Sequence, residues 1–139
     1  MIKVYVDCDV VLDLLTQRDP FYLYAAEFFK HVENKKVKAF ASPLIFTNVH
    51  YILRKSFSAK ETKNKLLKLR LLLSLVSIDS HILDLALSSG FKDFEDAVNY
   101  YAAIENNIPF FVTRNKKDYK KSQIPVYTAQ EFINLISIL

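Results

Sequence analysis

The sequence has few of the residues that interrupt regular structure and almost none that form disulfide bonds. Its 139 residues include one glycine, four prolines, one cysteine and no tryptophan. So few glycine and proline residues favour regular helices and strands joined by tight connections. The single cysteine, Cys8, excludes a disulfide bond within the chain and is compatible with a reducing cytoplasm.

Long apolar runs are also missing. No stretch approaches the roughly 18 apolar residues that a membrane span needs. Asp7, Asp9 and Asp13 interrupt the N-terminal segment where a signal peptide would require an unbroken apolar run. We therefore expect a cytoplasmic protein without membrane contact. The formal net charge of +4 leans modestly toward a polyanionic partner.

The composition that remains is that of a folded domain. Hydrophobic residues make up 51% of the chain and charged residues 24%, which is typical of globular proteins. The length suits one domain with a sizeable core, and the sequence contains no repeat, low-complexity tract or linker. We therefore predict a single domain over residues 1–139.

Segments typical of strands alternate with segments of helical periodicity. The expected strands are 2–6, 37–42, 74–78, 108–113 and 124–128. The expected helices are 9–17, 20–36, 43–57, 58–75, 81–89, 93–107 and 129–139. This alternation predicts an α/β fold with a parallel sheet covered on both faces, and ligands bind such sheets beyond the carboxyl ends of the strands.

Polar side chains follow several of these strands or open the helix before one of them. They are Asp7, Asp9, Ser42, Asp93, Glu95, Asp96, Thr113, Arg114, Asn115 and Asp118. Oxygen ligands without a cluster of histidine or cysteine favour a hard cation, Mg²⁺ or Mn²⁺. In a phosphodiester hydrolase such a cation lowers the pKa of a water molecule and offsets charge on the scissile phosphate.

Most of these acids also have a structural interpretation. Asp93 suits a helix N-cap, Asp96 suits the first turn of the same helix, and Asp9 could cap the helix that follows it. Asp118 could be a turn residue, and Asp13 is expected to be a solvated helix residue. Asp7 differs because an isolated acid at the end of a buried strand is costly unless it is paired or bound.

Four stretches together resemble the PIN domain in the small, single-domain form of VapC-like toxins. They are VYVDCDVVLDLL, ASPLIFTNVHYILRK, DFEDAVNYYAAIENN and FFVTRNKKDY, and they occur in the order and spacing of that family. The resemblance implies a three-layer α/β/α sandwich with a parallel sheet of about five strands. It also implies a metal-dependent endoribonuclease that acts on RNA, forms a homodimer and is held inactive by a small antitoxin protein.

The resemblance also assigns roles to individual residues. Asp7, Asp96 and Asp118 match the catalytic acids that bind Mg²⁺ or Mn²⁺. The expected substrate-binding residues are Ser42, Thr113, Arg114, Asn115 and Lys116, and the residues expected around the metal ligands are Asp9, Asn48 and Asp93. The cations expected to neutralise RNA phosphates are Arg54, Lys55, Arg114, Lys116 and Lys117.

One position departs from the family pattern. Asn48 stands where the family usually places a glutamate, and an amide lacks the charge that a cation attracts. This weakens the predicted metal affinity unless Asp9 or Asp93 compensates for the missing carboxylate.

Two alternative functions follow from the same residues. A catalytically weak PIN domain that binds RNA or a partner without cleaving is favoured by Asn48. A haloacid-dehalogenase-type phosphatase would use the stretch VYVDCDV, with Asp7 as nucleophile and Asp9 as general acid. The short chain and the absence of a later glycine-bearing acidic motif argue against the phosphatase.

Overall fold

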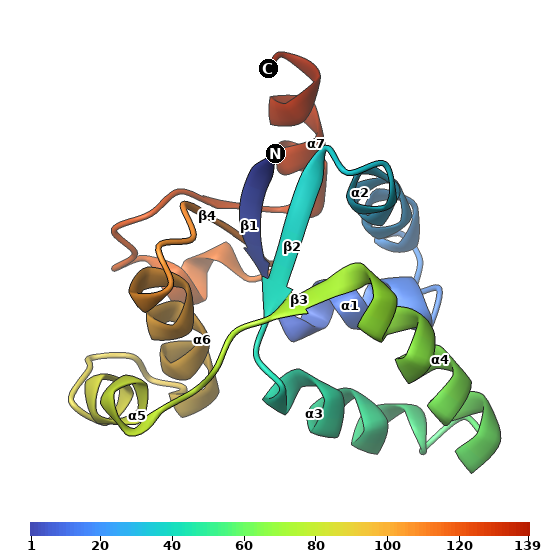
Figure 1. The fold of residues 1–139 in the computed structure, drawn as a ribbon, viewed down its shortest axis with the longest axis horizontal. Coiled ribbons are helices and arrows are strands. Elements are labelled where there is room, and N and C mark those ends of the chain that lie inside the picture. Colours follow the sequence, from blue (N-terminus) through green and yellow to red (C-terminus); the bar gives the residue numbers. More distant parts are fainter.

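The computed structural model describes residues 1–139 and is built around a five-stranded parallel sheet (Figure 1). The strands are β1 (Ile2–Val6), β2 (Val37–Ala41), β3 (Leu73–Leu75), β4 (Phe110–Val112) and β5 (Val126–Tyr127). Their order across the sheet is β3-β2-β1-β4-β5. The chain therefore begins in the middle of the sheet, extends it on one side with β2 and β3, and then on the other side with β4 and β5.

The central strand β1 is buried on both faces. Val4, Tyr5 and Val6 are each at most 1% exposed, and Val4 pairs with Ala39 of β2 and with Phe110 of β4. Strands in the middle of a covered parallel sheet need such a continuous apolar run. Because the strand order reverses at β1, its carboxyl end lies at the point where open α/β sheets bind their ligands.

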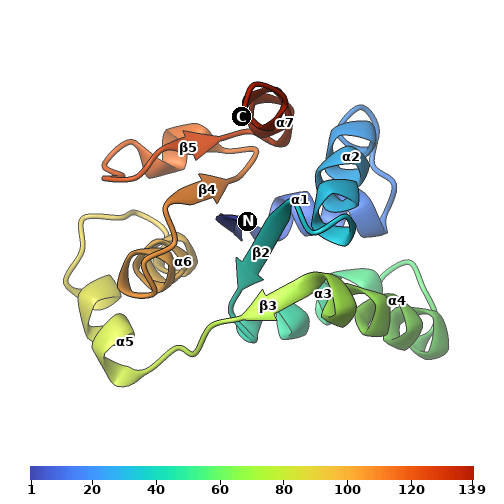
Figure 2. The ribbon, with the colours of Figure 1, turned by 45° about the horizontal axis from the view of Figure 1, so that its top comes forward.

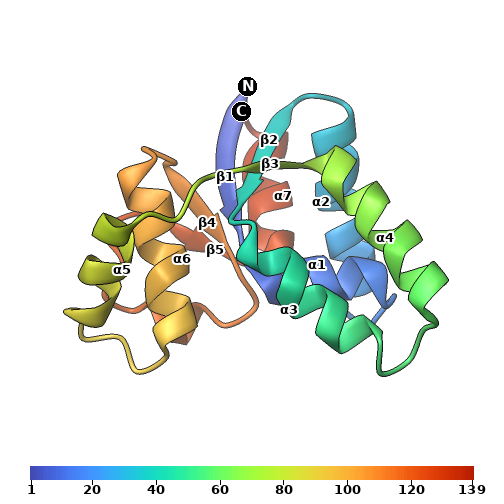
Figure 3. The ribbon, with the colours of Figure 1, turned by 60° about the horizontal axis from the view of Figure 1, so that its bottom comes forward.

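Helices cover both faces of the sheet, as Figures 2 and 3 show. They are α1 (Cys8–Leu15), α2 (Tyr22–Glu33), α3 (Leu44–Leu53), α4 (Ala59–Leu72), α5 (Ser80–Leu87), α6 (Phe94–Glu105) and α7 (Ala129–Ser137). One core joins Val4 and Val6 to α1, α2, α3, α4 and α7. The opposite core joins Tyr5 and Phe111 to α6, against which α5 packs. The predicted three-layer α/β/α sandwich is confirmed.

Local signals define several helix starts. Ser58 and Glu61 form a capping box at the start of α4, and Asp79 caps α5 by accepting a hydrogen bond from the backbone N–H of Ile82. None of the helices combines the length and the apolar character that crossing a membrane would require.

Three local expectations were wrong. The strand expected at 74–78 covers Leu73–Leu75 instead, and α4, expected to reach residue 75, ends at Leu72. The basic segment 114–122, expected from the sequence to be a loop, contains a 3₁₀ helix, Lys116–Tyr119. Asp13 is not solvated: it is 2% exposed and forms an ion pair with Arg114, at 2.9 Å between Oδ2 and Nε. The Arg114 side chain covers this acid and supplies the charge that its burial requires.

Candidate active site

Asp7 directly follows Val6, the last residue of β1, and is 9% exposed. Its Oδ1 accepts a hydrogen bond from the backbone N–H of Cys8 at 2.7 Å, so Asp7 is also the N-cap of α1. Its Oδ2 accepts from the hydroxyl groups of Thr113 at 2.9 Å and Tyr119 at 3.1 Å. Burial, followed by the nearby charge of Asp9, raises the pKa of Asp7 to about 6.

Asp9 lies beside Asp7, and both aspartates contact Thr113 in the segment after β4. The fully buried Thr113 hydroxyl lies 3.2 Å from Oδ2 of Asp9, and the backbone N–H of Arg114 donates to this oxygen at 3.0 Å. Oδ1 of Asp9 is buried and has no hydrogen-bond partner. Burial raises the pKa of Asp9, although the Arg114 N–H opposes the effect. Asp9 therefore retains one carboxylate oxygen able to accept a further contact.

Asp96 reaches Asp7 through Tyr119. The Tyr119 hydroxyl lies 3.2 Å from Oδ1 of Asp96, while Asp93 caps α6 by accepting from the backbone N–H of Asp96 at 3.0 Å. Burial raises the pKa of Asp96 to about 6, and the charges of Asp7 and Asp93 add to the effect. Burial also raises the pKa of Tyr119, together with the charges of Asp7 and Asp96, so this hydroxyl stays protonated and donates.

Asp118 is exposed and does not join Asp7. It lines an open cavity of about 570 Å³ beside Asp93 and Asp96. Four lysines share this cavity, Lys92, Lys117, Lys120 and Lys121. No three acidic, histidine or cysteine side chains lie close enough together to hold a metal ion as a ready-made set. The structure thus brings Asp7 and Asp96 together and leaves Asp118 at the outer side of Asp96.

The residues expected to bind substrate are largely committed to internal contacts. Ser42 is 2% exposed, and its Oγ accepts from the backbone N–H of Leu44 at the start of α3. Thr113 is buried under the two aspartates described above. Asn115 is exposed, and its backbone N–H donates to the Thr113 hydroxyl at 3.2 Å. These residues shape the end of the sheet.

The two cations expected to contact substrate are also paired. The Arg114 guanidinium forms an ion pair with Asp13 and lies 4.3 Å from the ring centre of Phe21. Lys116 Nζ contacts both carboxylate oxygens of Glu131, at 2.9 and 3.0 Å. Cations held in this way are less available for RNA phosphates than the lysines of the open cavity.

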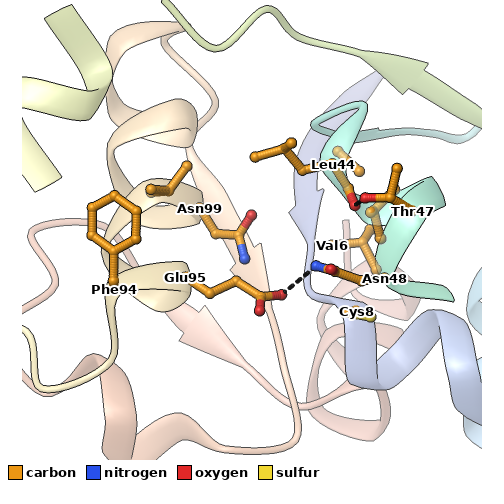
Figure 4. Close-up of a pocket in the computed structure, with 11 residues that line it drawn as sticks. Val6, Cys8, Leu44, Thr47, Asn48, Phe94, Glu95 and Asn99 are labelled. Atoms are coloured by element: carbon orange, nitrogen blue, oxygen red, sulfur yellow. Dashed lines mark hydrogen bonds between the residues drawn. The ribbon is translucent and has the colours of Figure 1, made fainter. Parts of the chain in front are cut away.

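Asn48 meets a carboxylate, but neither of the two considered from the sequence. Its Nδ2 donates to Oε1 of Glu95 at 2.9 Å, across the gap between α3 and α6 (Figure 4). Burial, followed by the charges of Asp7 and Glu95, raises the pKa of the nearby Cys8 thiol to about 12. Glu95 therefore brings a negative charge to this edge of the site.

Tyr119 was not predicted from the sequence, and Glu95 was named among the polar residues at the sheet edge without a specific role. The only signal for Tyr119 is that it directly follows Asp118. The contacts of Tyr119 and Glu95 could not be predicted, because they join segments far apart in the chain.

The donor set fits a divalent cation. All the available groups are oxygen ligands, and Asp9 retains a buried carboxylate oxygen without a partner. Mg²⁺ is commonly held by one or two protein carboxylates together with water and substrate phosphates. Asp7 and Asp96 supply such a pair, linked through one hydroxyl group.

Comparison with known proteins places the chain in a family. The family model described as PIN domain matches residues 3–117. The chain is 24% identical over 135 residues to Ribonuclease VapC1 of Aquifex aeolicus (strain VF5), covering 94% of this chain and 92% of that protein.

Solved structures share the fold. VapBC2 from Rickettsia felis, bound to a DNA fragment from their promoter, gives a TM-score of 0.64 at 15% identity, covering 91% of this chain and 97% of that chain. PAE2754 from Pyrobaculum aerophilum gives a TM-score of 0.66 at 14% identity, covering 99% of this chain and 91% of that chain. At such identities the likeness shows the fold alone. Because the family model spans most of the sequence, however, this chain belongs to the PIN domain family.

Proposed function

We propose that this protein is a metal-dependent endoribonuclease and the toxin of a toxin–antitoxin pair. The observation that carries the proposal is the meeting of two acids, Asp7 and Asp96, at the carboxyl edge of a PIN-domain sheet. The pKa of each is raised to about 6, as expected for groups whose negative charge lacks compensation. The likeness to a ribonuclease of Aquifex aeolicus supports the same activity.

Asp7 and Asp96 are the residues that would hold Mg²⁺ or Mn²⁺. Asp118 lies in the open cavity beside Asp96. When bound, the cation supplies positive charge that offsets the scissile phosphate and lowers the pKa of the attacking water. Thr113 and the backbone N–H of Cys8 fix the orientation of the Asp7 carboxylate. Tyr119 holds the Asp96 carboxylate toward Asp7.

The lysine-lined cavity beside Asp96 is the proposed path of the RNA backbone. Lys92, Lys117, Lys120 and Lys121 line this cavity. The other cations expected from the sequence are engaged elsewhere: Arg54 donates to the backbone carbonyl of Phe57, and Lys55 lies 4.8 Å from the ring centre of Tyr51. Phosphate contacts made by these lysines would position the strand without reading its sequence.

We also propose that a small antitoxin inhibits the protein and that the protein forms a homodimer. The likeness to VapBC2, which binds a DNA fragment from their promoter, supports a partner that carries DNA-binding activity. Light scattering of the isolated chain, and copurification with the product of a small neighbouring reading frame, test these two parts separately.

Cleavage of single-stranded RNA by the purified protein tests the activity. We expect cleavage with Mn²⁺ or Mg²⁺, none with EDTA, and none by Asp7→Asn or Asp96→Asn under any condition. Asp84→Asn, which removes the same charge from an exposed position on α5, is the matched control and should cleave normally. Cleavage that persists in EDTA, or in Asp7→Asn, would contradict the proposal.

The binding-module alternative is favoured by the amide of Asn48, at a position where the family resemblance implies a glutamate. RNA binding without cleavage at any metal concentration would favour it. The phosphatase alternative is set aside by the family match and by Asp9, whose Oδ2 is held by Thr113 and the Arg114 N–H.

A further inference from the structure

A second pocket lies between α3 and α6, beside the paired acids. Its volume is about 210 Å³, and it opens next to Cys8 and Glu95, the sequence neighbours of Asp7 and Asp96 (Figure 4). Leu44 and Ile45 of α3 form one apolar wall. The pocket is therefore a partly apolar recess, and two of its lining residues are sequence neighbours of the proposed metal ligands.

The facing wall comes from α6 and is also apolar, with Phe94 and Val98 lining the pocket. Phe94 is 49% exposed and Leu44 is 49% exposed, so both rims of the recess are accessible from solvent. Two apolar walls on opposite sides of a slot suit a flat aromatic group, since the faces of such a group are apolar and its polar atoms lie at the edge.

Two polar side chains of the pocket, Glu95 and Asn99, each keep an atom free for a further hydrogen bond. Glu95 uses Oε1 to accept from Nδ2 of Asn48, which leaves Oε2 free to accept. Asn99 uses Oδ1 to accept from the Tyr5 hydroxyl at 2.9 Å, which leaves its Nδ2 free to donate. Figure 4 shows both side chains directed into the gap between the helices. The recess thus presents a carboxylate acceptor beside an amide donor.

We propose that this pocket binds a guanine base of the RNA strand, next to the phosphate that is cleaved at Asp7 and Asp96. The proposal rests on the function proposed above and names the base that the site selects. Guanine carries adjacent N1–H and N2–H donors. Oε2 of Glu95 accepts one of them, and Oε1 accepts the other through its second lone pair, beside the bond from Asn48. The O6 acceptor of guanine matches the free Nδ2 of Asn99. Proteins read single-stranded RNA in this way, through the edges of unstacked bases.

The other bases fit this polar pattern less well. Adenine and cytosine each offer one amino group beside a ring nitrogen that is itself an acceptor, so that nitrogen would face the Glu95 carboxylate. Uracil has one N–H between two carbonyl groups. A site built to satisfy particular donors discriminates strongly against analogues that leave its polar groups unpaired.

Binding of short oligonucleotides tests the proposal independently of cleavage. Fluorescence anisotropy in EDTA compares an all-uridine strand with strands carrying one guanosine, one inosine or one adenosine. The guanosine strand should bind at least about tenfold tighter than the uridine and adenosine strands, as expected for hydrogen bonds to a charged group. Inosine lacks the N2 amino group and should lie in between.

Two variants locate the effect. Glu95→Gln should reduce the preference for guanosine by at least about tenfold, whereas Glu33→Gln, an exposed position at the end of α2, should leave it unchanged. Leu44→Trp, placed on a half-exposed rim, should fill the recess and remove the preference while the all-uridine strand binds as before. Equal affinity for all four strands, or a preference that survives both Glu95→Gln and Leu44→Trp, would overturn the proposal.

Cleavage mapping with Mn²⁺ separates this proposal from the proposed activity. Cuts next to guanosine, shifted or lost in Glu95→Gln, support both. Cuts without regard to guanosine support the nuclease and overturn the guanine pocket. Guanosine-selective binding without any cleavage supports the pocket and overturns the nuclease.

Discussion

Tyr119 Oη lies 3.1 Å from Oδ2 of Asp7, so the 3₁₀ helix after β4 is tied to the end of β1. The same hydroxyl lies 3.2 Å from Oδ1 of Asp96. A hydroxyl carries one proton and can donate fully to only one of these acids at a time. Tyr119 therefore holds two carboxylates together in the absence of a cation and competes with a cation for the same oxygen atoms.

Tyr119→Phe tests this competition. In EDTA the free energy of unfolding should fall by about 1 to 2 kcal/mol, because a hydrogen bond to a charged group is lost. The stabilisation produced by Mn²⁺ should increase, since the cation no longer displaces a hydroxyl from Asp7. Chemical denaturation with and without Mn²⁺ measures both changes. Tyr127→Phe, whose hydroxyl makes neither carboxylate contact, is the control, and an equal Mn²⁺ effect in wild type and Tyr119→Phe would argue against competition.

The stability of the metal-free protein should depend on pH through Asp7. Its pKa is raised from 3.8 to about 6 in the folded protein, so between these values the folded state keeps a proton that the unfolded chain has released. The free energy of unfolding therefore falls as pH rises through this window. The full effect of Asp7 is about 3 kcal/mol, at 1.36 kcal/mol for each pKa unit.

Chemical denaturation in EDTA at several pH values between 4 and 7.5 measures this effect. Asp7→Asn cannot take up the proton, so its stability should decline less than that of the wild type over the same range. Parallel pH profiles for the two proteins would contradict the raised pKa of Asp7.

Asn48→Glu places a second carboxylate against Glu95. The free energy of unfolding in EDTA should fall by about 1 kcal/mol, because two like charges then lie in contact near the surface. Added Mn²⁺ should stabilise this variant more than the wild type, since a cation offsets both charges. Asn48→Gln keeps the amide and serves as the size-matched control. A response to Mn²⁺ no larger than that of Asn48→Gln would show that position 48 does not face the cation.

RNA affinity should depend on salt through the lysines of the open cavity. Replacing Lys120 and Lys121 by glutamine should reduce the slope of log affinity against log salt concentration by about 1.4, at about 0.7 for each phosphate contact with a single strand. Lys116→Gln should change the slope much less, because Lys116 is paired with Glu131. A titration in which Lys116→Gln has the larger effect would place the RNA backbone on the other side of the 3₁₀ helix.

The sequence allowed the fold to be predicted because its local signals agree with its tertiary arrangement. The buried run of β1, the capping box at Ser58 and Glu61, and the polar residues after the strands are all visible in the chain itself. The family resemblance added the order of the motifs and is confirmed by the family match.

The internal geometry of the site could not be read from the sequence. Thr113 was expected to bind substrate, yet it is fully buried under Asp7 and Asp9. Arg114 was expected to face RNA, yet burial of Asp13 in α1 requires its charge. Such contacts join side chains that are far apart in the sequence, so local sequence patterns do not predict them.

The central claim is that Asp7 and Asp96 bind one divalent cation together, and calorimetric titration of Mn²⁺ into the purified protein tests it most directly. We predict that Asp96→Asn binds Mn²⁺ at least about tenfold more weakly than wild type while its stability in EDTA is maintained or improved, because a charge is removed from an acidic pair. Asp93→Asn, at the cap of α6, should retain most of the affinity. Equal Mn²⁺ affinity in wild type and Asp96→Asn would contradict the claim.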